Sequence, residues 1–231
     1  EYFCEEIYQL TFDMLKKTKD LGEALQNRQK EAVQTLMEAL VGVGIAMAYA
    51  GNSRPASGSE HHLSHFFEVV GILNKEPYFA HGIDVVYSSI YTQRLREELL
   101  VIADGMIDEK SERIFCWEDW EKNIREIYTD AADGVIALQK KLGWYNSDKR
   151  RIYKEKWGEI KSVLQEAPTE KELMGYLKQI GLDINQFDTL YGNKKINHAI
   201  RYAKDLNLFP ILFSIKNVWI AHVHITNFKN R

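Results

Sequence analysis

The stretch Gly51-Asn52-Ser53-Arg54-Pro55-Ala56-Ser57-Gly58-Ser59-Glu60-His61-His62-Leu63-Ser64-His65 separates two long helical patterns and decides the fold on both sides of it. Gly51 and Asn52 are residues that end a helix. Ser57, with Glu60 three residues later, is a capping-box pattern, which predicts that the next helix begins at Gly58. The stretch therefore predicts a helix, a sharp break and a second helix.

Helical periodicity continues in both directions from this break. Residues 2–19 and 29–49 are predicted helices, and the second of these turns Ala32, Leu36, Leu40, Val43 and Met47 inward. The C-terminal half of that second helix is apolar all round, which predicts that it is centrally buried. Further helices are predicted over residues 58–73, 81–102, 117–141, 148–166, 170–180 and 194–205. Only residues 211–225 have a β-branched, aromatic composition, so the prediction is an all-α domain.

Composition excludes several classes of protein. The 231 residues are 45% hydrophobic and 27% charged, as in a folded globular protein. A formal net charge of −3 argues against a nucleic-acid partner. Cys4 and Cys116 fit a reducing compartment better than a disulfide framework. The longest apolar run, residues 40–50, is too short to span a bilayer. We therefore expect a cytoplasmic protein with no membrane partner.

The histidines around the break form a candidate metal site. His61, His65 and Glu68 are spaced i, i+4 and i+7, so they lie on one face of a helix. His81, followed by Gly82, opens another predicted helix. Imidazoles that converge from two rigid elements are typical ligands of a divalent metal. The spacing therefore indicates a metal centre between the starts of two helices.

A structural interpretation of each histidine stands beside this one. A single histidine at a helix start is commonly a cap or a surface residue, and Glu60 is assigned mainly to capping. His62 points about 100° away from the shared face. His198 is predicted on a helix surface, and the alternating His222 and His224 are a much weaker metal candidate. Trp117 and Trp120 are expected to anchor a helix start in the core, and Lys149-Arg150-Arg151 to form a solvated helix face.

The motif Ser-Arg-Pro-x-Ser-Gly-Ser-Glu-His-x-x-Ser-His over residues 53–65 resembles the sn-glycerol-1-phosphate dehydrogenases. These enzymes belong to the superfamily of glycerol dehydrogenases, iron-containing alcohol dehydrogenases and dehydroquinate synthases. The His-Gly pair at 81–82, the Pro-Thr-Glu-Lys-Glu-Leu stretch from residue 168 and the His-Ala-Ile-Arg-Tyr-Ala-Lys stretch from residue 198 are similar as well. The resemblance extends from near residue 1 to about residue 206.

The resemblance implies a fold, a reaction and a set of site residues. It implies a helical bundle like the C-terminal metal-binding domain of the dehydroquinate synthase-like superfamily. It implies that His61 and His81 are metal ligands for zinc or nickel and that His65 is a catalytic residue that contacts substrate or relays a proton. The cationic Arg54 is a candidate for binding the substrate phosphate, on charge alone. The metal would polarise a secondary alcohol while a hydride passes to NAD or NADP.

Some features of that family are expected to lie outside this chain. No glycine-rich phosphate loop or βαβ pattern occurs in it, so the N-terminal nucleotide-binding domain that would bind NAD or NADP is expected to be absent. The family's third metal ligand, an aspartate, is expected upstream of Glu1. We therefore expect a helical metal- and substrate-binding domain over residues 1–206, a divergent tail over residues 207–231, and no activity of the chain alone.

Two other functions are compatible with the residues. One is a dehydroquinate-synthase-like lyase domain, against which the Ser-Arg-Pro string and Ser64 argue. The other is a non-catalytic helical interaction module whose histidines are structural. The expected partner is a small phosphate ester. A homo-oligomer is compatible with the sequence as well.

Overall fold

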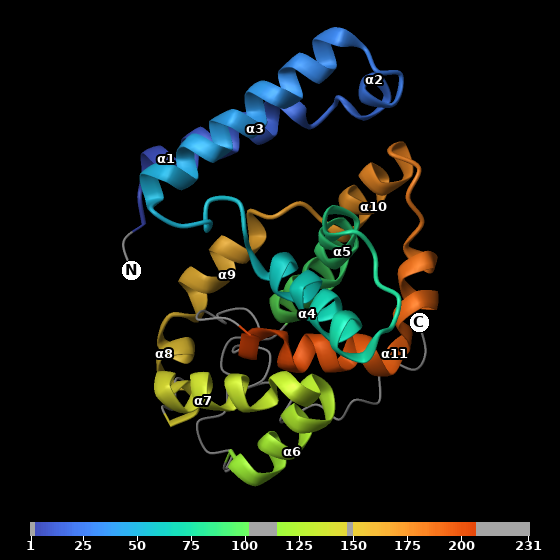
Figure 1. Cartoon of the computed structure of the whole chain (residues 1–231). Coiled ribbons are helices and arrows are strands. Elements are labelled where there is room, and N and C mark those ends of the chain that lie inside the picture. The colour runs from blue at the N-terminus through green and yellow to red at the C-terminus, as the bar shows by residue number, and fades with distance from the viewer. Residues whose placement is uncertain (1–2, 102–114, 147–149, 207–231) are drawn as a thin grey trace. The chain divides into compact units, whose positions relative to one another are not determined.

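The computed structural model describes residues 3–101, 115–146 and 150–206, and within these ranges it is built from helices without strands (Figure 1). The prediction of an all-α domain is confirmed for these residues. The predicted β-branched tail, with His222 and His224, lies outside the described residues, as do Lys149 and the side chain of Arg150. The chain divides into two compact units: Glu1–Gly58 with Lys171–Ile184, and Ser59–Glu170 with Asn185–Arg231.

The first unit is a helical hairpin with two shorter helices. Its elements are α1 (Glu5–Thr18), α2 (Gly22–Gln26) and α3 (Lys30–Ala50), joined by most of α10 (Glu170–Gln179). Helices α1 and α3 pack side by side (Figure 1). The buried residues of α3 recur every seven positions, at Ala32, Ala39 and Ala46, which places them on one narrow stripe. The side chain of Met14 fills the space above Gly42, where a Cβ would lie 2.7 Å from the Met14 sulfur.

The expected central burial of α3 is wrong. Leu40, predicted to point inward, is 57% exposed, and Val41, Ile45 and Tyr49 are exposed with it. The reason is that α3 packs through its narrow stripe of alanines, whereas an all-round apolar sequence does not show which face is covered.

By length and composition α3 is also the one described helix that is long and apolar enough to cross a membrane. This is weak evidence, because core helices of soluble proteins and signal sequences meet the same two criteria.

The second unit surrounds an aromatic core between α4 (Ser59–Asn74), α5 (His81–Leu100) and α11 (Ile184–Tyr202). Phe187 of α11 is fully buried, and its ring lies 5.1 Å from that of Phe67 and 5.5 Å from that of Tyr87. The ring of Tyr191 stacks on Phe67 at 4.0 Å. One aromatic cluster thus joins three helices that are far apart in the sequence.

A second set of buried contacts lies near α6 (Trp117–Tyr128) and α7 (Ala132–Leu142), which pack together. The Asp205 side chain accepts hydrogen bonds from Trp120 Nε1 at 3.1 Å and from the Tyr145 hydroxyl at 2.6 Å, and pairs with Lys204 at 2.7 Å. The hydroxyl of Tyr128 donates to the Tyr202 carbonyl. The expectation that a helix start is anchored in the core is thereby confirmed for Trp120, whereas Trp117 is only half-buried.

Three predicted helices differ from the structure by more than a few residues at their ends. The single helix predicted over residues 117–141 is interrupted by a short 3-10 turn, Thr129–Ala131, because Thr129 takes a positive φ of 41°. The helix predicted over residues 148–166 is broken at Lys156 into α8 (Arg150–Glu155) and α9 (Trp157–Gln165). Helix α11 consists of two helical segments joined at Gly192, whose φ of 65° and ψ of 160° are not helical. The predicted helix from residue 194 corresponds to the second segment, and the segment that begins at Ile184 was not predicted. A 3-10 turn, Ala203–Leu206, follows α11, and Trp144–Asn146 forms another.

Removing the ring of Phe187 tests the aromatic core. Phe187→Ala is expected to lower the free energy of unfolding by about 3–5 kcal/mol, because a fully buried ring is lost and a cavity is left. Urea titration followed by circular dichroism measures this change. The matched control is Val163→Ala in α9, whose side chain is 65% exposed and whose loss is expected to change stability by less than about 0.5 kcal/mol.

Candidate metal centre

Two neighbouring helices of the second unit bring the predicted histidines together. Helix α4 carries His61, His65 and Glu68 on one face, as their spacing predicts, and α5 begins at His81. The two helices pack against each other (Figure 1). The ring centroid of His81 lies 5.0 Å from that of His65 and 5.5 Å from that of His61. The predicted convergence of imidazoles from two helix starts is therefore present.

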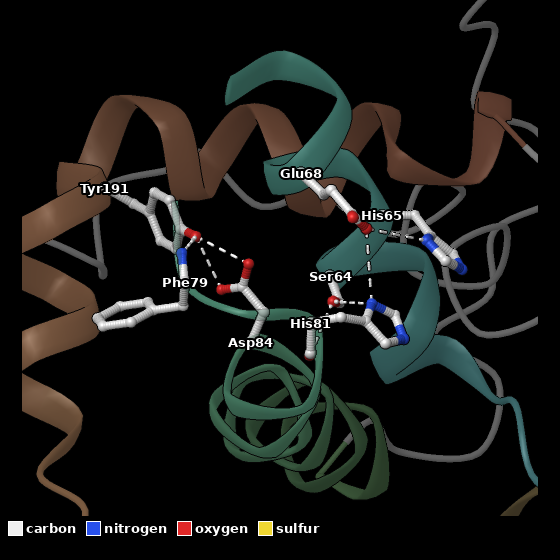
Figure 2. A network of polar contacts seen from close by, with 7 residues as sticks. All are labelled: Ser64, His65, Glu68, Phe79, His81, Asp84 and Tyr191. Atoms are coloured by element: carbon white, nitrogen blue, oxygen red, sulfur yellow. Dashed lines mark hydrogen bonds and ion pairs between the residues drawn. The ribbon is translucent and has the colours of Figure 1, made fainter. Parts of the chain in front are cut away.

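A carboxylate lies between two of these imidazoles. Glu68 Oε2 is 3.6 Å from His81 Nδ1 and 3.7 Å from His65 Nδ1. Figure 2 shows both Nδ1 atoms facing Glu68, with the second ring nitrogens directed away from it. One ligand atom each from His65, Glu68 and His81 lies within 4.8 Å of the others. These three residues are therefore the described group closest to the geometry of a metal site.

Two further side chains orient the imidazoles. The Ser64 hydroxyl lies 3.1 Å from His81 Nδ1 and 3.4 Å from the His81 carbonyl oxygen. His61 Nδ1 lies 2.9 Å from Glu60 Oε1. Glu60, which was assigned mainly to helix capping, thus also contacts a predicted metal ligand. Neighbours of this kind, which contact a ring nitrogen, fix the orientation and tautomer of ligand histidines.

Burial and neighbouring charge favour the neutral form of the imidazole at the centre of the cluster. The pKa of His65 is lowered, first by burial and then by the nearby His81, while Glu68 acts in the opposite direction. The pKa of His62 is lowered as well, mainly by burial. A neutral imidazole is the form that binds a metal.

The start of α5 is held by a buried network that the sequence analysis did not identify. The Tyr191 hydroxyl accepts a hydrogen bond from the Phe79 backbone N–H at 3.1 Å and lies 2.8 Å from both carboxyl oxygens of Asp84 (Figure 2). Asp84 is fully buried. Phe79 and Asp84 flank His81 in the sequence, so Tyr191 of α11 contacts the backbone before a candidate ligand and a side chain after it.

The loop before α5 crosses α4 at Gly71. A Cβ at this position would lie 2.6 Å from the Tyr78 ring and 3.2 Å from the Glu76 carbonyl oxygen. Glycine is therefore required for this close approach, which brings residues 76–80 over α4 and places His81 beside Ser64 and Glu68.

Arg54, the predicted phosphate-binding residue, belongs to the first unit. It is exposed in the turn after α3, and its backbone N–H donates to Asn52 Oδ1 at 3.0 Å. The histidines belong to the second unit. The substrate-binding role of Arg54 stays a prediction, as do the roles of His61 and His81 as ligands and of His65 in catalysis.

Sequence reasoning placed Glu68 on the correct face but gave it no role. The signal was available, since His65 and Glu68 are three residues apart and this spacing puts an imidazole and a carboxylate side by side on a helix. Asp84 and Tyr191 had no comparable signal, because they are 107 residues apart.

Asp84 makes stability depend on pH. Burial is the main reason that the pKa of Asp84 is raised from 3.8 to about 7 in the folded chain. Between about pH 4 and about pH 7 the unfolded chain binds fewer protons at this carboxyl than the folded chain does, so the contribution of Asp84 to the free energy of unfolding falls over this range and then levels off. A shift of about 3 units corresponds to up to about 4 kcal/mol.

The Asp84→Asn variant is expected to lose this contribution. Urea unfolding of the chelator-treated protein measures the free energy of unfolding at pH 5 and at pH 8. The value at pH 5 minus the value at pH 8 should be smaller in the variant than in the unsubstituted chain. Equal differences in both proteins would show that Asp84 does not carry the dependence.

Comparison with known proteins shows similarity to one group of enzymes. The chain is 30% identical over 134 residues to the glycerol-1-phosphate dehydrogenase (NAD(P)+) of Bacillus licheniformis, which covers 58% of the chain and 31% of that protein. The enzyme of the same name from Geobacillus thermodenitrificans is 32% identical to the chain over 138 residues, which cover 59% of the chain and 33% of that protein. That of Korarchaeum cryptofilum is 34% identical over 109 residues, or 47% and 35%.

No family model and no solved structure matches the chain. The predicted likeness to the C-terminal domain of the dehydroquinate synthase-like superfamily therefore stays a prediction at the level of the fold. The matched part spans about a third of the length of these curated relatives. Over roughly half of its own length, this chain is similar to glycerol-1-phosphate dehydrogenases.

Proposed function

We propose that this chain is the helical metal-binding part of a metal-dependent, NAD(P)-linked oxidoreductase that interconverts sn-glycerol 1-phosphate and dihydroxyacetone phosphate. The observation that carries the proposal is the cluster of His61, His65 and His81. Its rings lie 5.0 to 6.3 Å apart at the packed starts of two helices. The similarity to glycerol-1-phosphate dehydrogenases supports the choice of reaction.

The donor set suits a divalent transition metal. Imidazole nitrogens bind zinc and nickel well, and a nearby carboxylate compensates the charge of the ion. Ring centroids of imidazoles that share one tetrahedral ion are expected about 5 Å apart, given metal–nitrogen bonds of about 2 Å. Of the three ring separations, the two that involve His81 come close to this value. In the proposal His61 and His81 hold zinc or nickel, which acts as a Lewis acid on the substrate alcohol.

The residues of the chain have separate roles around that ion. His65, with its lowered pKa, is available as a neutral base that accepts the proton of the alcohol or passes it on. Ser64 and Glu60 keep the rings of His81 and His61 in their orientations. Arg54 supplies positive charge for the phosphate of the substrate. In this proposal NAD or NADP is held by a nucleotide-binding domain outside the 231 residues, so the chain alone turns over no substrate.

The proposed partner and cellular location follow from the proposed reaction. The partner is a small phosphate ester in the cytoplasm, with neither nucleic acid nor a membrane involved. A formal net charge of −3 supports the exclusion of nucleic acid.

Metal titration tests the proposed site. His61→Ala is expected to raise the dissociation constant for zinc at least about tenfold, because an imidazole donor is lost. Isothermal titration calorimetry on the chelator-treated chain measures the constant. The matched control is His198→Ala in α11, which is expected to bind zinc as the unsubstituted chain does. Tight binding that is unchanged in His61→Ala would refute the assignment of His61.

A further inference from the structure

The helical hairpin of the first unit buries little apolar surface of its own. No residue of α1 or α2 is buried, and the buried residues of α3 are all alanines. The described residues of this unit that are buried are Ala32, Ala39, Ala46, Leu177 and Ile184. A unit of this size needs a larger core than these side chains provide. Its remaining apolar surface therefore requires a cover.

Large apolar side chains are exposed along both helices of the hairpin. A row of aromatic rings follows α1, with ring centroids 5.7 Å apart for Phe3 and Tyr8 and 5.9 Å apart for Tyr8 and Phe12. We define the apolar face as the exposed residues Phe3, Tyr8, Phe12, Leu15, Val33, Met37 and Leu40. Aromatic and long aliphatic side chains of this kind contribute most of the binding energy of protein interfaces.

Helical geometry places the two halves of the apolar face on the same side of the hairpin. The members in α1 lie roughly 100° around the helix from the row that includes Met14 and packs on α3. The members in α3 lie roughly 130° around that helix from its alanine stripe, in the same sense along the chain. Because the two helices of a hairpin run in opposite directions, equal senses of rotation lead to the same side. Gln34 and Glu38, which are hydrogen-bonded to each other, lie on another side of α3.

We propose that the apolar face binds a second copy of this chain, so that two hairpins form an antiparallel four-helix bundle with two-fold symmetry. Each of its seven side chains exposes roughly 100 Å², so the face offers on the order of 700 Å². Each partner in a stable interface contributes about 800 Å². The proposal is independent of the candidate metal centre, which belongs to the second unit.

Charges at the two ends of α1 make the apolar face complementary to itself. The first turn carries Glu5 and Glu6, and the last turn carries Lys16 and Lys17. Glu5 and Lys16 both lie beside Phe12 around the helix, at opposite ends of the apolar face. When two copies of α1 pack antiparallel, each Glu5 faces Lys16 of the partner subunit, and two-fold symmetry repeats this pair. Parallel packing would bring like charges together, so the charges favour the antiparallel arrangement.

Both charges are available for contacts between copies. Among the described residues, Glu5 has no ion pair. Lys16 lies 3.7 Å from Asp13, in a pair whose side chains are both at least half exposed, and such pairs contribute little to stability. Glu5 and Lys16 are about 16 Å apart along the helix axis, so they cannot pair within one copy.

A lipid surface is the competing partner, because α3 is long and apolar enough to cross a membrane. Membrane-binding helices carry mainly basic residues beside their apolar face, since the lipid surface is anionic. The apolar face is instead bordered by Glu5 at one end and Lys16 at the other. Opposite charges at opposite ends fit a second copy better than a membrane.

Sedimentation equilibrium of the full chain at several concentrations tests the proposed dimer. The unsubstituted chain is expected to reach twice the mass of one chain. Leu40→Gln is expected to raise the dimer dissociation constant at least about tenfold, because it puts a polar group in the interface. Leu40 is 57% exposed, so the fold should be unchanged, which circular dichroism checks. The matched control is Val163→Gln in α9, which is expected to leave the constant unchanged.

Exchanging the two charges tests the antiparallel arrangement. Glu5→Lys and Lys16→Glu are each expected to raise the dimer dissociation constant about three- to tenfold, because symmetry makes each substitution create two repulsive contacts. The double variant Glu5→Lys/Lys16→Glu is expected to return to within about twofold of the unsubstituted value. An equal mixture of the two single variants is expected to form mixed dimers more tightly than either variant pairs with itself.

Three results would overturn the inference. The first is a chain that stays monomeric at all concentrations, including one that sediments with phosphatidylcholine vesicles as a monomer. The second is a dimer whose dissociation constant is unchanged by Leu40→Gln. The third is a double variant that dimerises no better than Glu5→Lys alone, because this would show that Glu5 and Lys16 do not meet between copies.

Discussion

The hydroxyl of Tyr191 is the contact on which the candidate metal centre depends. It accepts a hydrogen bond from the Phe79 N–H and lies 2.8 Å from the buried carboxyl of Asp84. Its ring stacks on Phe67 of α4. One side chain of α11 therefore joins the helix that carries His65 and Glu68 to the start of the helix that carries His81. This contact therefore adds to the direct packing of the two helices in fixing the relative position of the imidazoles.

Much of this arrangement could be predicted from the sequence because it is local. The capping pattern at Ser57 and Glu60 and the periodic apolar residues identify α4, which begins one residue after the predicted start. The spacing of His61, His65 and Glu68 is sufficient to place them on one helix face. His81 next to Gly82 marks the start of α5. In each case the signal and the structure involve the same few residues.

The parts that were missed depend on contacts between distant residues or on special backbone angles. Nothing near Thr129 shows that it takes a positive φ and divides one predicted helix into two. The alanine stripe of α3 is visible in the sequence, but the face that packs on α1 is decided by the partner helix. The link from Asp84 to Tyr191 spans 107 residues and exists only after α11 has packed onto α4 and α5. Tertiary packing decides each of these features, and no local pattern encodes it.

The absence of a side chain at Gly71 determines how far the site tolerates change. The loop that leads to His81 rests directly on the α4 backbone there, with the Tyr78 ring and the Glu76 carbonyl in the space that a Cβ would occupy. Even alanine would have to lift the loop, and residues 75–80 form the whole connection between α4 and α5. A residue six positions after the nearest imidazole of α4 thus affects the spacing between the two ligand-bearing helices. The lack of a side chain at this crossing is therefore a condition for bringing the two helix starts together.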